Sequence, residues 1–272
     1  MKKAGSILLG TAVMAAGFLL GIQPSLAGTL LFDRGLPTAN LNNAAGSNRS
    51  NVAWADSESS TTPSEYWLPG DNFALSTNAT VNDIRVWTIG DSAPTGLSLL
   101  GGDQGGAIST ISNTYTSQSV TYAGGSTYQG SSGSYLNIYQ LDFSVNLNLA
   151  ANQTFDFFLN GPWSYDSTAS TYTNAFLLAS NAPLSGSPQQ GADGVFLWLD
   201  VNTGAGTQTV ETWYSGAGGG SSGFGPAWDK NSDGNVQVFG TVPEPPTALL
   251  FGFGLAAMVA WGLKSRKART IQ

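Results

Sequence analysis

One strongly alternating segment constrains the fold of this chain more than any other feature of its sequence. From Tyr139 onward, apolar side chains occupy every second position and polar side chains lie between them. The apolar set is Tyr139, Leu141, Phe143, Val145, Leu147 and Leu149. A period of two places successive side chains on opposite faces of a β-strand. Residues 135–149 are therefore predicted to form a long strand with one face buried.

Shorter segments of similar character fill most of the chain, and no interior stretch of a dozen residues shows a helical period of 3.6. Clusters of Gly, Asn, Asp, Ser and Pro between them favour turns. The other predicted strands are 28–33, 71–76, 80–89, 96–100, 107–115, 118–122, 154–159, 174–179, 195–200, 207–214 and 235–241. This pattern predicts an all-β fold, a single antiparallel β-sandwich that is jelly-roll-like and spans residues 28–242.

The composition excludes several chemistries. The chain has no His and no Cys, so it cannot hold a Ser-His-Asp or Cys-His catalytic group, a Cys/His zinc site or a disulfide. Residues 28–242 carry sixteen acidic and four basic side chains. This acidic balance argues against a nucleic-acid partner, because phosphate binding needs clustered Lys and Arg.

The first 27 residues have the order of a secretory signal peptide. Lys2 and Lys3 precede an apolar run from Ile7 to Leu20, and Ser25-Leu26-Ala27 forms a small-x-small cleavage site. We expect a signal helix over residues 1–27, export through the Sec translocon, and a mature chain that starts near Gly28.

A second apolar segment follows a proline-rich motif. Pro243-Glu244-Pro245 and Pro246 precede residues 247–263, which carry no charge. Seventeen residues span about 25 Å as a helix, near the short limit for crossing a bilayer. Four cations follow this segment and would be held on the cytoplasmic side of the membrane: Lys264, Arg266, Lys267 and Arg269. We expect a C-terminal transmembrane helix over 247–263.

The Pro-Glu-Pro tripeptide, the short apolar span and the basic tail together resemble the PEP-CTERM protein-sorting segment, here residues 243–269. The extra Pro246 departs mildly from that pattern. The resemblance implies that the chain is a substrate of exosortase, a membrane-embedded protease that cuts near Pro243, Glu244 and Pro245. It also implies passage through the inner membrane, delivery to the cell surface or extracellular matrix, and an association with exopolysaccharide and biofilm. The segments 71–76 and 79–87 are similar to the first core strands of many PEP-CTERM passenger domains.

Residues 229–234 match the opening of a calcium loop. Asp229, Asn231 and Asp233 occupy its first, third and fifth positions, and Gly234 occupies the sixth. The twelfth position is Gly240 instead of the usual Glu. A polar turn that leads into the last strand is the alternative interpretation, and otherwise we expect no cofactor.

Aromatic side chains in loops offer a carbohydrate-binding surface. Such rings stack on the apolar faces of sugars, and the candidates are Trp163, Tyr165, Trp213 and Trp228. Core packing is the alternative role for these rings. Paired carboxylates could also hydrolyse a glycan, with candidates Asp156, Asp166, Asp193, Asp200 and Glu211, although the sequence defines no pair among them.

These observations favour an exported, non-enzymatic surface or matrix protein. A lectin-like module that binds polysaccharide, with or without Ca²⁺, is the first alternative. A secreted glycan hydrolase is the second.

Overall fold

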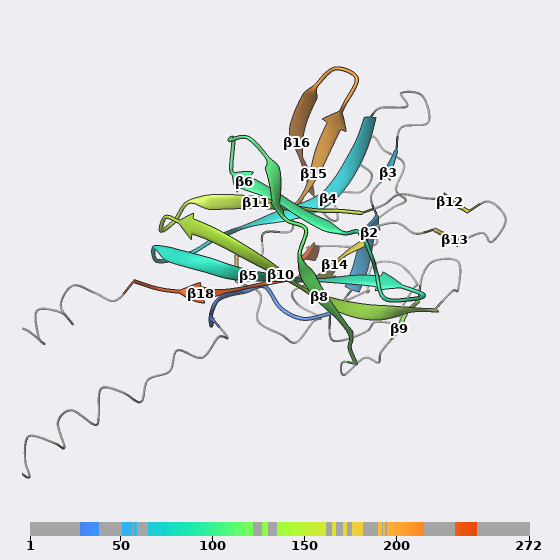
Figure 1. The fold of residues 1–272 in the computed structure, drawn as a ribbon, viewed down its shortest axis with the longest axis horizontal. Coiled ribbons are helices and arrows are strands. Elements are labelled where there is room, and N and C mark those ends of the chain that lie inside the picture. Colours follow the sequence, from blue (N-terminus) through green and yellow to red (C-terminus); the bar gives the residue numbers. More distant parts are fainter. Residues whose placement is uncertain are drawn as a thin grey trace, which may run out of the picture.

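The computed structural model describes residues 28–37, 51–55, 57–58, 65–121, 127–129, 135–161, 165–166, 171–172, 176–181, 190–191, 193, 195–214 and 232–243. Every regular element in these ranges is a β-strand, and every strand pair is antiparallel (Figure 1). The described ranges contain no helix with the length and apolar character needed to cross a bilayer. The predicted all-β, antiparallel class is confirmed. The expected helices at 1–27 and 247–263 lie outside the described residues.

The first sheet is built on the long strand β10 (Tyr135–Leu149), whose predicted bounds are confirmed. It pairs with β5 along most of its length, from Asn137 opposite Gly90 to Leu149 opposite Ala79. The strand order is β1-β18-β5-β10-β8, and β9 also pairs with β10. The bounds are β1 (Thr29–Asp33), β5 (Ala79–Gly90), β8 (Tyr115–Ser119), β9 (Thr127–Gln129) and β18 (Val236–Thr241).

The second sheet has the order β16-β15-β4-β11-β6-β7, with β3 paired to β4. Its strands are β3 (Ser57–Glu58), β4 (Glu65–Ala74), β6 (Ser98–Asp103), β7 (Ser109–Ser112), β11 (Thr154–Asn160), β15 (Val195–Asn202) and β16 (Thr207–Tyr214). Two smaller sheets have the orders β12-β13 and β17-β14-β2. Their strands are β2 (Asn51–Ala55), β12 (Tyr165–Asp166), β13 (Thr171–Tyr172), β14 (Phe176–Asn181) and β17 (Ser232–Gly234).

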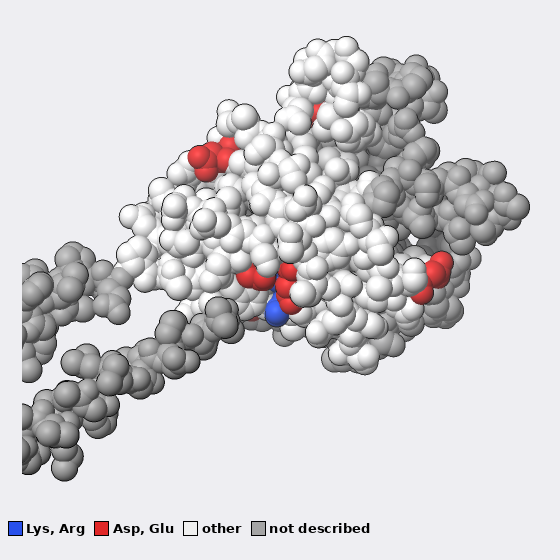
Figure 2. All heavy atoms as spheres, in the orientation of Figure 1, with Lys and Arg blue, Asp and Glu red and all other residues white. Residues whose placement is uncertain are grey.

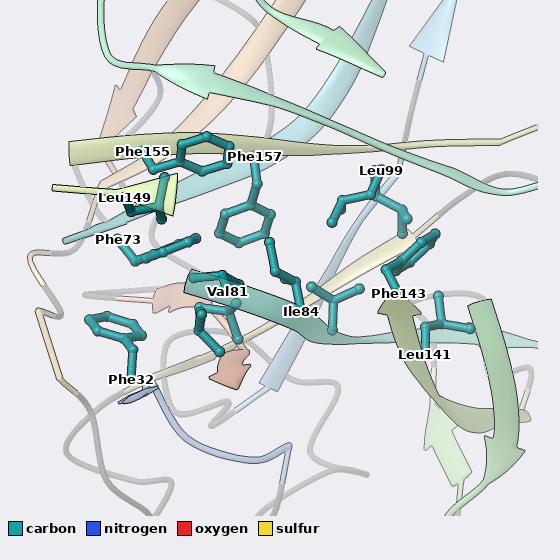
Figure 3. Close-up of a cluster of buried hydrophobic side chains, with 14 of the residues drawn as sticks. Phe32, Phe73, Val81, Ile84, Leu99, Leu141, Phe143, Leu149, Phe155 and Phe157 are labelled. Carbon is teal, nitrogen blue, oxygen red and sulfur yellow. The ribbon is translucent and has the colours of Figure 1, made fainter. Parts of the chain in front are cut away.

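The main hydrophobic core lies between the two large sheets (Figure 3). Ile84 of β5 and Phe143 of β10 reach it from the first sheet, and Phe157 of β11 reaches it from the second, all three fully buried. The Phe73 ring lies 5.6 Å from the rings of both Phe32 and Phe155. Burial of each such side chain contributes about 1.5–3 kcal/mol relative to exposure. The two sheets are therefore held face to face by apolar contacts.

Side chains of β10 alternate between buried and exposed positions, as the sequence pattern predicts. Leu141 and Phe143 are fully buried, whereas Ser144, Asn146 and Asn148 are exposed. The polar face of β10 is the outer face of its sheet. There Asp142 lies opposite Arg85 of β5, with the Arg85 Nε atom 2.5 Å from Asp142 Oδ1.

One predicted strand, 107–115, is wrong as a single element. β7 ends at Ser112 in the second sheet, and β8 begins at Tyr115 in the first. The Ser112 hydroxyl donates to the Thr114 carbonyl (3.0 Å) and accepts from the Thr114 N–H (3.2 Å). This local turn moves the chain from one sheet to the other, which the apolar pattern alone does not show.

β4 begins six residues before the predicted start at Asp71. Pro69 and Gly70, residue types that are common in turns, both lie within the strand and pair with β15. β11 pairs with β4 only from Gly70 onward, so Pro69 has a partner strand on one side only. Such an edge-like position tolerates the missing N–H of proline.

Candidate functional site

The C-terminal motif begins where the described fold ends. β18 ends at Thr241, and Thr241, Val242 and Pro243 are exposed. Glu244 and Pro245 lie outside the described residues, as do the cations Lys264, Arg266, Lys267 and Arg269. The first residue of the predicted sorting tripeptide therefore lies in exposed chain, two residues beyond the last strand.

A buried ion pair joins the two large sheets near the other end of the chain. Arg34 follows β1 and Asp71 lies in β4, and Arg34 Nη1 is 2.7 Å from Asp71 Oδ1. Arg34 is 1% exposed and Asp71 is fully buried. Arg34 also donates to the backbone carbonyls of Gln190 and Gly191, each at 3.1 Å. Through these contacts Arg34 links the end of β1, strand β4 and residues 190–191. Removal of either charged partner would leave the other charge buried and unpaired.

Asp71 also makes contact with β17. Its Oδ2 atom accepts the Gly234 N–H at 2.5 Å, and its Oδ1 atom accepts the Asn72 N–H at 2.7 Å. Burial raises the pKa of Asp71, and Arg34 and these two N–H groups oppose that rise. Sequence reasoning did not single out Arg34 or Asp71. The one available signal was that Arg34 is among only four cations in residues 28–242 and directly follows an apolar strand.

The structure describes one of the three predicted calcium ligands. Asp233 lies in β17 and is fully buried, and its Oδ1 atom accepts the N–H of Asp193 at 3.0 Å. Burial, and secondarily the negative charge of Asp71, raises the pKa of Asp233 to about 7. Asp229 and Asn231 lie outside the described residues. In the described part of the chain, no three acidic side chains are placed to hold a metal ion.

The candidate aromatic residues are not placed by the structure. Trp163 and Trp228 lie outside the described residues. Tyr165 lies in β12 and Trp213 in β16, but the description of these two residues does not extend to their side chains. Carbohydrate binding through these rings stays a prediction.

The candidate carboxylates lie in different parts of the fold. Asp156 of β11 is 1% exposed, and its Oδ1 atom has no hydrogen-bond partner among the described residues. Burial, and then the charge of Asp71, raises the pKa of Asp156 to about 6. Asp200 lies in β15 and Glu211 in β16, and Asp193 contacts Asp233. The side chain of Asp166 lies outside the described residues.

A pocket of about 260 Å³ opens beside Arg34. Its apolar wall comes from β1, and its polar wall comes from neutral side chains of β4, β11 and the residues around them. The lining consists of Leu31, Phe32, Arg34, Asn72, Ala74, Ser76, Thr154, Gln190 and Gly191. Because Asp71 neutralises Arg34, the pocket presents amide and hydroxyl groups without a net charge.

Charged groups are sparse on the face of the molecule in Figure 2, where most described atoms belong to uncharged residues. The Arg85–Asp142 pair is partly exposed, with 27% and 24% of the two side chains accessible. Burial, and then the charge of Asp142, raises the pKa of the neighbouring Asp83 to about 6. This outer surface offers no concentrated positive charge among the described residues.

Comparison with known proteins identifies the C-terminal segment. Residues 241–267 match the family model of the PEP-CTERM protein-sorting motif. Neither the curated proteins nor the solved structures contain a match to the chain. The matched segment includes the tripeptide, the apolar span and three of the four cations that carried the predicted resemblance, which is thereby confirmed. The chain therefore carries a PEP-CTERM protein-sorting motif at residues 241–267, which supports its assignment as an exported protein sorted by exosortase.

Proposed function

We propose that this protein is a non-enzymatic component of the cell surface or extracellular matrix, associated with exopolysaccharide in biofilm. In this proposal residues 1–27 direct Sec export and are removed. Residues 28–242 then fold outside the cytoplasm as a jelly-roll-like sandwich. The consecutive strands β4–β5 pair with β10–β11 across both sheets, which supports that topology.

The sorting segment would act in two stages. Residues 247–263 stop in the inner membrane, held by Lys264, Arg266, Lys267 and Arg269 on the cytoplasmic side. Exosortase then cuts near Pro243, Glu244 and Pro245, which frees the domain for the surface. The observation that carries this proposal is the family-model match, which starts at the last residue of β18.

Replacement of Pro243, Glu244 and Pro245 by Ala in the native host tests this mechanism. We expect the variant to keep the mass of the unprocessed tail and to stay in the membrane fraction. Pro246→Ala is the matched control, since it removes a neighbouring proline outside the tripeptide. Normal processing and surface delivery of the triple variant would refute the proposal.

A second candidate function is a lectin-like module, and the pocket beside Arg34 favours it. Asn72, Ser76 and Thr154 supply amide and hydroxyl groups next to the apolar side chains of Leu31 and Phe32. Neutral polar groups beside an apolar wall suit a sugar ring. A glycan array tests this candidate. A signal lost in Asn72→Ala would place the sugar in the pocket, and a signal lost in Trp163→Ala would place it at the loop aromatics.

Calcium assistance of such binding would require Asp229, Asn231 and Asp233 to act together. Since Asp233 Oδ1 already holds the Asp193 N–H, binding would have to use its other oxygen or displace this contact. Calorimetric titration with Ca²⁺ decides the point, because absence of both heat and a shift in melting temperature would exclude a site.

A further inference from the structure

β8 is the outermost strand at one side of the first sheet. It pairs with β10, and none of the described strands pairs with its other side. Residues 116–119 of this strand are all exposed. β8 crosses the front of the molecule in Figure 1. The strand therefore presents a free backbone edge to solvent.

The hydrogen bonds to β10 show which backbone groups of β8 lie on that free edge. The Thr114 carbonyl accepts the Ser144 N–H at 3.1 Å, and the Val120 N–H donates to the Ile138 carbonyl at 3.0 Å. Successive residues of an antiparallel strand direct their N–H and C=O groups to opposite sides. The even-numbered residues from 114 to 120 therefore bond β10, and the odd-numbered residues between them point away from it. These outward residues are Tyr115, Ser117 and Ser119.

The edge of β8 has none of the features that normally block the addition of another strand. Edge strands are usually protected by charged side chains, by proline or by a β-bulge. β8 contains no charge and no proline, and its register with β10 is continuous. No charged residue lies between Asp103 and Asp142 in the sequence, and most atoms around β8 in Figure 2 belong to uncharged residues. A second strand could therefore approach this edge without charge repulsion along it.

Two other edge strands are less suited to such pairing. Gln190 already occupies the outer edge of β1, where its N–H donates to the Asp33 carbonyl at 3.0 Å and its Oε1 atom accepts the Asp33 N–H at 2.7 Å. The register of β1 also shifts between Leu30 and Phe32. β16 carries Glu211 near its middle, so antiparallel pairing of two copies about that point would bring like charges together.

We propose that two copies of this chain pair through β8, antiparallel and in a register centred on Ser117. In this register Ser117 lies opposite its own counterpart, and Tyr115 of each copy lies opposite Ser119 of the other. Each of these residue pairs exchanges two N–H···O=C bonds, because all the residues involved point outward. A shift of the centre by one residue would leave one outward residue of each copy without a strand partner. A second copy is the occupant that this edge fits, since the edge is its own complement about a two-fold axis.

The size of the contact predicts how strong this pairing is. Stable complexes bury about 1,200–2,000 Å² in total, and two paired strands of five residues cover less than that. We therefore expect a weak dimer that forms at high local concentration. Covalent trapping is the appropriate way to detect it.

The chain has no native cysteine, which allows a direct test of the register. Ser117→Cys places two thiols at the two-fold axis, with Cα atoms about 5.5 Å apart, a separation that a disulfide can span. Ser119→Cys is the matched control, because its Cα atoms would lie about 14 Å apart along the paired strands. During mild oxidation of the full-length chain in detergent, we expect Ser117→Cys to form covalent dimers at least about tenfold faster than Ser119→Cys. Equal rates in the two variants, or no dimer in either, would overturn the proposal.

Sedimentation velocity over a range of protein concentrations provides a second test that needs no new covalent bond. Ser117→Lys places two like charges opposite each other at the axis, so we expect the dimer dissociation constant to rise at least about tenfold. Asn146→Lys adds the same charge on the exposed face of β10 and should leave that constant unchanged. A dimer that is insensitive to Ser117→Lys would overturn the proposal. Oxidation of Ser117→Cys in the native host that yields only adducts with a different polypeptide would also overturn it, because the edge would then serve another partner.

Discussion

The Arg34–Asp71 ion pair provides the most specific prediction about stability. Replacement of Arg34 by Met keeps most of the side-chain volume but leaves Asp71 buried without its cation. Asp71 also raises the pKa of both Asp156 and Asp233, which are buried near it. Loss of one partner from a buried pair costs about 3–5 kcal/mol. For a domain of this size, we expect a melting temperature lower by about 6–20 °C at pH 7.5.

The dependence of this loss on pH identifies its cause. Without Arg34, the pKa of Asp71 rises further, so the carboxyl becomes neutral at a higher pH. The loss in Arg34→Met should therefore be smaller at pH 4.5 than at pH 7.5. The double variant Arg34→Met with Asp71→Asn should recover part of the stability at pH 7.5, because residue 71 is then neutral and needs no cation beside it.

Urea unfolding of the purified protein at the two pH values measures these differences. Arg85→Met is the matched control, because the Arg85–Asp142 pair is partly exposed. Exposed pairs contribute about 0–1 kcal/mol. An equal loss of stability at both pH values, or equal losses in Arg34→Met and Arg85→Met, would refute the assignment of the effect to a buried charge.

Three further predictions concern pH, the core and the outer face of the first sheet. In the folded state Asp156 has a pKa of about 6 and Asp233 a pKa of about 7, both above the ordinary 3.8. Their contribution to the free energy of unfolding is therefore full below about pH 4 and is lost as the pH rises to 7. Thermal melts should show higher stability at pH 4.5 than at pH 8. Asp156→Asn should remove part of this dependence and stabilise the protein by about 1–3 kcal/mol at pH 8, and a steeper pH dependence would contradict the reasoning. Phe157→Ala, at a fully buried ring, should cost about 3–5 kcal/mol in urea unfolding. Asn146→Ala, on the exposed face of β10, should change stability by less than about 0.5 kcal/mol. Equal losses of stability in Phe157→Ala and Asn146→Ala would disprove the assignment of Phe157 to the core and of Asn146 to the surface.

Sequence patterns predicted the strand in which apolar and polar residues alternate, because this alternation marks the buried face. The alternation from Tyr139 to Leu149 gave the C-terminal end of β10 and the face that is buried, because a period of two places successive side chains on opposite faces of a strand. The sorting motif was equally accessible, since its three parts lie next to one another in the chain. Neither prediction required knowledge of which strands pair.

Features that depend on pairing could not be predicted. The 107–115 segment was predicted as one strand, and only its neighbours β6 and β10 show that it belongs to two sheets. The same limit applies to Arg34, which contacts Asp71 and Gly191 across long separations in sequence. A lone cation after a strand is normally exposed, and its burial follows from the position of β4 and β17 in space.

The pairing of the first strand with the last also bears on export. Thr29 and Gly240 are partners although more than two hundred residues separate them, and the core between the sheets includes Val236 and Val238 of β18. Contacts between such distant segments form late, because the entropy of closing the loop is lost before the contacts compensate for it. The sandwich therefore cannot be completed until residue 241 is on the same side of the membrane as residue 29. The proposed export of an unfolded chain through the Sec translocon, with the proposed retention of residues 247–263 in the inner membrane, would satisfy this requirement, because the last strand would reach the first only after both had crossed.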